Sequence, residues 1–205
     1  MGNFTVTAYN HLLSIHEAHE RFATQLSREG ITREQLFTKL APLFAQGEHS
    51  GRYAVCLMHR HYSLNPGKRM VTNDFITQPS VDFSSNIISD QWSSTGEEIE
   101  HSIINNPTSR PPPPSADFTA KFKSVIDEHG VTVLGVCYAP ENLPDGYELM
   151  EMSGPGDRVQ LLSMVRASSV DKSKSYQAVW IPGSDGCHRS CVNCFGTGHF
   201  VSSGN

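Results

Sequence analysis

The run 131–139, VTVLGVCYA, constrains the fold more than any other part of the sequence, because it is apolar at successive positions rather than alternate ones. A strand with this pattern is typically buried on both faces. The preceding segment carries Phe118, Phe122 and Ile126 on one helical face and ends at Gly130. We therefore predict an amphipathic helix that leads directly into a strand buried on both sides.

The remaining periodic segments alternate between helical and extended patterns. The first fifty residues predict two helices, the first ending at Gly30 and the second beginning with a capping box formed by Thr32 and Gln35. The residues 53–64 read as a strand, and KRMVTNDFIT is expected to return beside it as its partner. YELMEM and RVQLLSMVRA predict a hairpin, and YQAVWIPG predicts a last strand.

These elements predict an α+β fold with a mostly antiparallel sheet, two N-terminal helices, one central helix and a C-terminal Cys/His zinc-binding segment. We expect one domain over residues 1–205, with a helical segment at 1–50 and a zinc-binding segment at 185–200. A long polar and proline-rich loop is expected at 89–115. One short helix is expected to start within it at Thr95, and its glutamates, Glu97, Glu98 and Glu100, are interpreted as a solvated face.

Size and charge narrow the classes of function. A chain of 205 residues can bury a core in a single domain, and its formal net charge of -5 disfavours general nucleic-acid binding. No apolar run is long enough to span a bilayer, and the first residues lack the pattern of a secretory signal. We expect a soluble, cytoplasmic protein without disulfides and without a membrane partner; oligomeric state stays open.

The C-terminal segment DGCHRSCVNCFGTGHF carries three of the five cysteines. Cys187, Cys191, Cys194 and His199 combine thiolates separated by two and three residues with a following imidazole, a donor set that suits Zn²⁺. The stretch from Cys191 resembles a zinc knuckle, although Gly204 stands where the last knuckle cysteine would fall. We therefore predict that Cys187 supplies the missing ligand of a zinc site.

Three coordination arrangements remain open. If all four residues bind, the site is closed and structural, and catalysis has to come from elsewhere. If only three bind, the fourth position is open for a substrate oxygen or a water. In the third arrangement, a histidine from the strand at 53–64 completes a mixed site.

A second constellation is His59-Arg60-His61, in which two imidazoles two residues apart share one face of a strand. Neutral imidazoles serve as metal ligands or as acid/base groups, so His59 and His61 are the candidate catalytic residues. Cys56 and Cys137 lie in apolar strands and are interpreted as inert core residues, unless Cys56 faces the metal.

The segments MHRHYSLNPGKRMV and CHRSCVNCFGTGH, together with the chain's small size, resemble the fungal zinc-containing, hemocyanin-like cyclopenases, or viridicatin synthases, of quinolone alkaloid biosynthesis. The resemblance implies a zinc-dependent lyase. Such an enzyme converts a cyclopenin-type benzodiazepinedione epoxide into a viridicatin-type quinolone and releases methyl isocyanate, so the implied partner is a small aromatic heterocycle. That reaction calls for a Lewis acid and a proton carrier rather than a redox group.

The alternative is a non-enzymatic, zinc-stabilised interaction module that binds single-stranded nucleic acid as zinc knuckles do. Phe195 and Phe200 offer stacking surfaces, but only His188 and Arg189 are basic near the cluster. Binding of an oligonucleotide at low salt, lost as salt rises, is the observation that separates this alternative from the enzyme.

Overall fold

The structure is a computed structural model that describes residues 4–81, 86–104, 112–140, 143–154, 158–183 and 189–192. The described helices are α1 (Val6–Asn10), α2 (Ile15–Glu29), α3 (Arg33–Phe44) and α4 (Ala116–Glu128), with short 3-10 turns at Gly47–His49 and Ala167–Ser169. The strands are β1 (Tyr53–Leu57), β2 (Arg69–Asn73), β3 (Ile76–Ser80), β4 (Ile87–Ser93), β5 (Glu98–Ile103), β6 (Leu134–Tyr138), β7 (Tyr147–Ser153), β8 (Gln160–Arg166), β9 (Tyr176–Trp180) and β10 (Arg189–Val192).

The ten strands form a closed barrel in the order β1-β6-β4-β5-β2-β3-β8-β7-β10-β9, and β9 pairs with β1 to complete the ring. The pairs β2–β5 and β7–β10 are parallel, and the other pairs are antiparallel. The predicted α+β class, a sheet accompanied by helices, is therefore wrong. The sheet closes on itself, which removes its edges, and the helices lie outside it.

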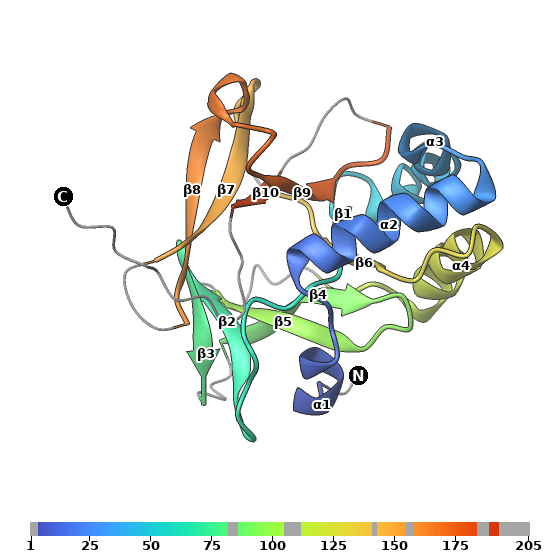
Figure 1. The fold of residues 1–205 in the computed structure, drawn as a ribbon. Coiled ribbons are helices and arrows are strands. Elements are labelled where there is room, and N and C mark those ends of the chain that lie inside the picture. The colour runs from blue at the N-terminus through green and yellow to red at the C-terminus, as the bar shows by residue number, and fades with distance from the viewer. Residues whose placement is uncertain are drawn as a thin grey trace.

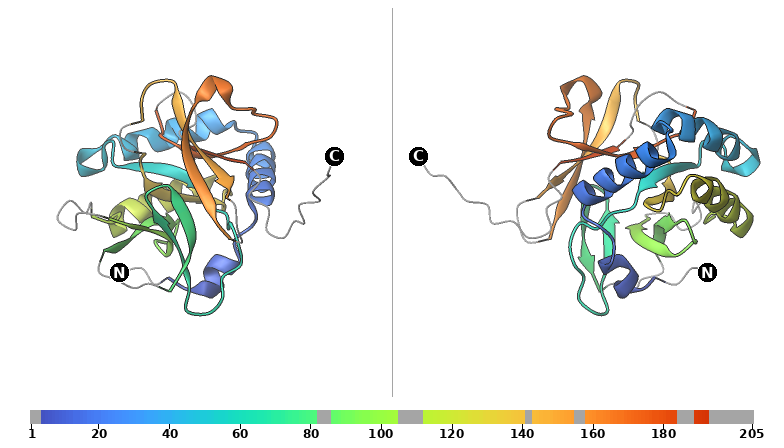
Figure 2. Two further views of the ribbon diagram at one scale, coloured as in Figure 1. Left: turned by 90° about the vertical axis from the view of Figure 1, so that its left-hand side faces the viewer. Right: turned by 45° about the vertical axis from the view of Figure 1, so that its right-hand side comes forward.

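The helices gather on one side of the barrel. Figure 1 shows α2, α3 and α4 together on the side opposite the β7–β8 hairpin, and both views in Figure 2 agree. They cover the outer face of β1, β6 and β9, where Val55, Val136 and Trp180 join the helical side chains Phe22 and Phe122 in one core. The predicted strand at VTVLGVCYA is confirmed as β6, and its first four residues are buried.

The other faces of β1, β6 and β9 point into the interior of the barrel. Because side chains alternate along a strand, Cys56 on β1 and Cys137 on β6 point inward between residues that face the helices. They pack with Met58, Met70 and Val179 in a second apolar cluster. The barrel interior is thus apolar around β1 and β6, and it becomes polar toward β5, β7 and β10.

Three local predictions are corrected by the strand pairing. KRMVTNDFIT does not return beside β1; it forms its own hairpin, β2–β3, which turns at Asp74 with a positive φ of 53°. The residues predicted as one strand over 53–64 are extended only to Leu57. The polar stretch 89–115 is not a continuous loop, because β4 and β5 pair within it and β5 lies where a short helix was expected.

The caps of the N-terminal helices are set by single polar residues. The predicted first helix is divided: α1 ends at Asn10, and Ser14 starts α2 with a capping box. The backbone N–H of Glu17 donates to the Ser14 hydroxyl over 3.3 Å, and Glu17 Oε2 accepts from the Ser14 N–H over 2.9 Å. Gly30 ends α2 in the left-handed conformation with φ 66°, as predicted. No helix among the described residues is long and apolar enough to cross a membrane.

Replacing Ser14 by alanine is expected to lower the free energy of unfolding by about 1 kcal/mol, because the first turn of α2 loses its side-chain acceptor. Ser27→Ala, an exposed position within the same helix, is the matched control and is expected to change stability by less than about 0.5 kcal/mol. Urea unfolding of both variants measures the difference in their free energies of unfolding, provided that the two variants have the same m-value. Equal stabilities for the two variants would contradict the cap assignment.

Candidate metal centre

The segment that follows β1 is irregular but firmly attached to the N-terminal residues. The Arg60 N–H donates to the Leu13 carbonyl over 2.8 Å, and the Leu64 N–H donates to Asn10 Oδ1 over 2.7 Å. The His61 N–H donates to the Tyr9 hydroxyl over 3.1 Å. This segment is therefore held in place by α1 and the turn that follows it, although it belongs to no strand.

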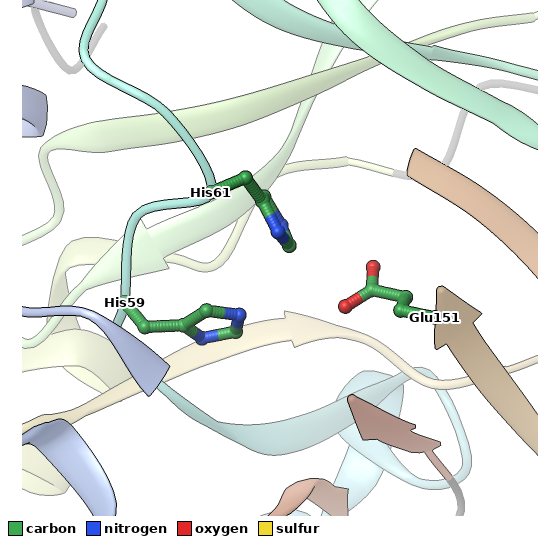
Figure 3. Close-up of side chains that lie close together, drawn as sticks. All are labelled: His59, His61 and Glu151. Carbon is green, nitrogen blue, oxygen red and sulfur yellow. The ribbon is translucent and has the colours of Figure 1, made fainter. Parts of the chain in front are cut away.

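Two histidines of this segment converge with a glutamate from β7. His59, His61 and Glu151 each place one ligand atom within 4.8 Å of the others, and Figure 3 shows the three side chains pointing toward a common space. Their exposed fractions are 7%, 1% and 1%, respectively. They are the one group of three or more His, Cys, Asp or Glu side chains with this geometry in the described part of the chain.

His59 presents its Nε2 to the cluster as a hydrogen-bond acceptor. Its Nδ1 lies 2.8 Å from the Leu57 carbonyl oxygen, which can only accept, so Nδ1 carries the proton. Burial, together with the nearby His61, lowers the pKa of His59 to about 3, so the ring is neutral. A backbone carbonyl that fixes the ring and its tautomer is the usual second support of a metal-binding histidine.

His61 lies between the cluster and a second carboxylate, Glu100 on β5. Its Nε2 is 3.2 Å from Glu100 Oε1, yet neither ring nitrogen makes a hydrogen bond of acceptable geometry. Burial disfavours charge on both groups, but their mutual attraction outweighs it, raising the pKa of His61 and lowering the pKa of Glu100 to about 2. Gln91 Nε2 also donates to Glu100, over 3.0 Å.

Glu151 is held by two residues of the neighbouring strand β10. The parallel register places Cys191 opposite Glu151, and the Cys191 thiol donates to Glu151 Oε2 over 2.6 Å. The guanidinium of Arg189 donates to Glu151 Oε1. Cys191 Sγ also lies 3.6 Å from His59 Nε2, so the thiol contacts two members of the cluster.

The donor set fits a metal ion. Two imidazoles and a carboxylate are common first-row metal ligands, and a thiolate at Cys191 would complete a four-residue set. A buried histidine whose ring nitrogens make no hydrogen bond is unusual in a protein interior, and a bound cation would satisfy one of them. The His59, His61 and Glu151 cluster can thus bind a metal ion.

The structure brings together only part of the predicted site. Cys191 lies fully buried beside His59, which corresponds to the mixed arrangement of a C-terminal cysteine with a strand-region histidine. Cys187, Cys194 and His199 lie outside the described residues, so their predicted role as zinc ligands stays a prediction. Part of the segment 185–200 forms β10, which delivers Cys191 into the barrel.

Glu151, Glu100 and Arg189 were missed as site residues. Glu100 was interpreted as part of a solvated helix face, but it lies on β5 and is 2% exposed. Arg189 was noted only as a basic group near the cysteines. One signal for Glu151 was present, because its strand alternates so that Tyr147, Leu149 and Glu151 share a face, and a single carboxylate on such a face is a candidate ligand.

The fold and the site together define a closed β-barrel protein with a buried His/Glu cluster able to bind a metal ion. Comparisons of the chain with protein-family models, with curated proteins and with solved structures give no match.

Proposed function

We propose that the protein is a zinc-dependent lyase of the cyclopenase type, acting on a cyclopenin-type benzodiazepinedione epoxide. The observation that carries the metal-dependent part is the convergence of His59, His61 and Glu151 inside the barrel, with Cys191 beside them. The substrate class comes from the resemblance of the segments around His59 and Cys191 to that family.

Zinc bound by His59, His61 and Glu151 would be better suited to catalysis than zinc enclosed by a cluster of thiolates. Zinc held by these residues would supply a Lewis acid that polarises a substrate oxygen. Two neutral imidazoles and one carboxylate donate less negative charge than three thiolates, which leaves the ion a stronger acid. In this proposal Cys191 is either the fourth ligand or the group that substrate displaces.

The protein groups around the cluster suit a reaction that moves protons without electron transfer. The epoxide and the two products contain the same atoms, so the ring contraction needs no oxidant or reductant. In this proposal Glu100, which lies 3.2 Å from His61 and outside the ligand set, takes up or releases a proton beside the cluster, and burial excludes water that would hydrolyse an isocyanate. Arg189 keeps the carboxylate of Glu151 oriented.

Apolar side chains lie on the same face of the β7–β8 hairpin as Glu151. On the β7–β8 hairpin, Leu149 lies on the same face as Glu151 and pairs directly with Met164. Exposure rises along this face from 1% at Glu151 to 52% at Met164. This gradient supports entry of a flat, apolar substrate from the β8 side.

The test is metal analysis joined to turnover. We expect the purified chain to contain about one zinc per molecule and to convert the epoxide into the quinolone. Removal of zinc with a chelator is expected to abolish turnover, and addition of one equivalent of zinc is expected to restore it. Formation of the quinolone is followed by chromatography and mass spectrometry.

The outcomes separate the two parts of the proposal. Zinc bound at the cluster without turnover of the epoxide would overturn the lyase assignment and leave the metal centre standing. Full turnover by a folded, zinc-stripped protein would overturn the catalytic role of the metal.

A further inference from the structure

Three sulfur-containing side chains, Cys56, Met58 and Cys137, lie in one apolar cluster inside the barrel, and none of them belongs to the His59/His61/Glu151 centre. Cys56 Sγ lies 3.8 Å from Met58 Sδ, and Cys137, on the neighbouring strand β6, packs in the same buried cluster as both residues. The side chains are 2%, 5% and 3% exposed for Cys56, Met58 and Cys137, respectively. They belong to the apolar cluster that fills the interior between β1 and β6.

The strand register explains why these sulfurs meet. In the antiparallel pair β1–β6, Ala54 lies opposite Cys137 and Cys56 lies opposite Gly135. The two cysteines are therefore diagonal neighbours on the inward face. Such neighbours have Cα atoms about 7–8 Å apart, beyond the usual span of a disulfide, so the register favours a shared ligand over a direct bond.

Gly135 makes room for the third sulfur. A Cβ at this position would collide with Met58 Sδ and with the carbonyl oxygen of Trp92. The Met58 side chain therefore lies over the bare backbone of Gly135, directly across from Cys56. A glycine at this point in a buried strand creates the space in which the thioether approaches the thiol.

The spacing and the chemistry of the sulfurs fit a soft metal ion. Three sulfur ligands about 2.3 Å from one ion in a plane lie about 4 Å apart, close to the observed separation of Cys56 and Met58. Thiolate and thioether ligands select Cu(I) over harder ions, and oxygen ligands are missing from this trio. Burial and the neighbouring Cys137 raise the pKa of the Cys56 thiol, so it stays protonated until an ion displaces the proton.

We propose that Cys56, Cys137 and Met58 form a Cu(I)-binding site, separate from the His59/His61/Glu151 centre. Binding forms two copper–thiolate bonds and one copper–thioether bond and releases two protons to solvent. Copper stays in the Cu(I) state throughout, so no oxidant or reductant takes part. The inference does not depend on the proposed lyase activity, because its ligands come from a different set of side chains.

The test removes the competing thiols first. The chain has five cysteines, so the variant Cys187→Ser/Cys191→Ser/Cys194→Ser keeps only Cys56 and Cys137. This variant is refolded without oxygen in the presence of Cu(I), and retention is measured against a coloured Cu(I) chelator. We expect one Cu(I) per chain to be retained, with the fold checked by circular dichroism and urea unfolding.

Further substitutions in this background decide the ligand set. Cys137→Ala is expected to abolish retention, and Met58→Leu, which keeps the volume and loses the sulfur, is expected to weaken it about tenfold or more. Met164→Leu, an exposed methionine, is the matched control and is expected to retain Cu(I) fully. No retention by the folded parent variant, or undiminished retention after Cys137→Ala, would overturn the proposal.

Discussion

Glu151→Gln is expected to reduce zinc affinity by more than about 100-fold, because it removes the only anionic ligand among His59, His61 and Glu151. The amide is nearly the same size, and its oxygen can still accept from Arg189, so the fold should survive. Competition with a chromophoric zinc chelator measures the affinity, and elemental analysis measures the zinc content of the purified protein.

Glu148→Gln is the matched control for this experiment. Glu148 lies on the same strand and is also buried, at 4% exposure, but it is three residues away and lies outside the cluster. Its substitution should leave zinc affinity unchanged within about twofold. If Glu151→Gln binds zinc as tightly as the control does, the carboxylate is not a ligand and the centre proposed here is wrong.

The second large effect concerns stability. Gly135→Ala is expected to lower the free energy of unfolding by about 3 kcal/mol or more, because the new Cβ collides with Met58 and with the backbone of β4 at Trp92. A backbone carbonyl in a sheet cannot move aside as a flexible side chain can. Urea unfolding monitored by tryptophan fluorescence and by circular dichroism gives the change.

Gly146→Ala separates steric from conformational effects. Gly146 has a positive φ of 76° with no atom near its missing Cβ, so alanine there is strained but does not collide. The expected loss is about 1 kcal/mol. A Gly135→Ala variant no less stable than Gly146→Ala would show that β4 and β6 are not packed as closely as described.

Local signals in the sequence were sufficient for individual elements. The capping residue Thr32 and the glycine at 30 correctly placed helix ends, and the apolar run at 131–139 correctly predicted β6. The β7–β8 hairpin also followed from two extended runs separated by a turn. Helix caps, a buried strand and a hairpin depend on residues close together in the chain, so one sequence is enough to predict them.

Closure of the barrel could not be predicted in the same way. The partners of β1 are β6 and β9, which lie far along the chain, and no local pattern specifies those pairings. β4 begins just before a stretch that was expected to be a polar loop, and β5 lies where a short helix starting at Thr95 was expected, because this part of the chain is polar. In the closed barrel some of these polar side chains point inward, and Glu100 pairs there with His61.

Prediction of the site residues from the sequence is limited for the same reason. His59, His61 and Cys191 were singled out because imidazoles and thiols are chemically distinctive, whereas a glutamate within an extended strand is common on solvated surfaces. Only the pairing of β7 with β10 reveals that Glu151 faces Cys191. Convergence of groups from β7, from β10 and from the segment that follows β1 is a property of the closed barrel.

The position of β10 in the ring has a consequence for how the protein is made. β10 lies between β9 and β7 and carries Cys191 and Arg189, so the ring is incomplete until residue 192 has left the ribosome. His59, His61 and Glu151 are all synthesised before β10, but Cys191 and Arg189, which hold the Glu151 carboxylate, are not. Closure of the barrel around the candidate metal centre is therefore expected only after β10 has been synthesised.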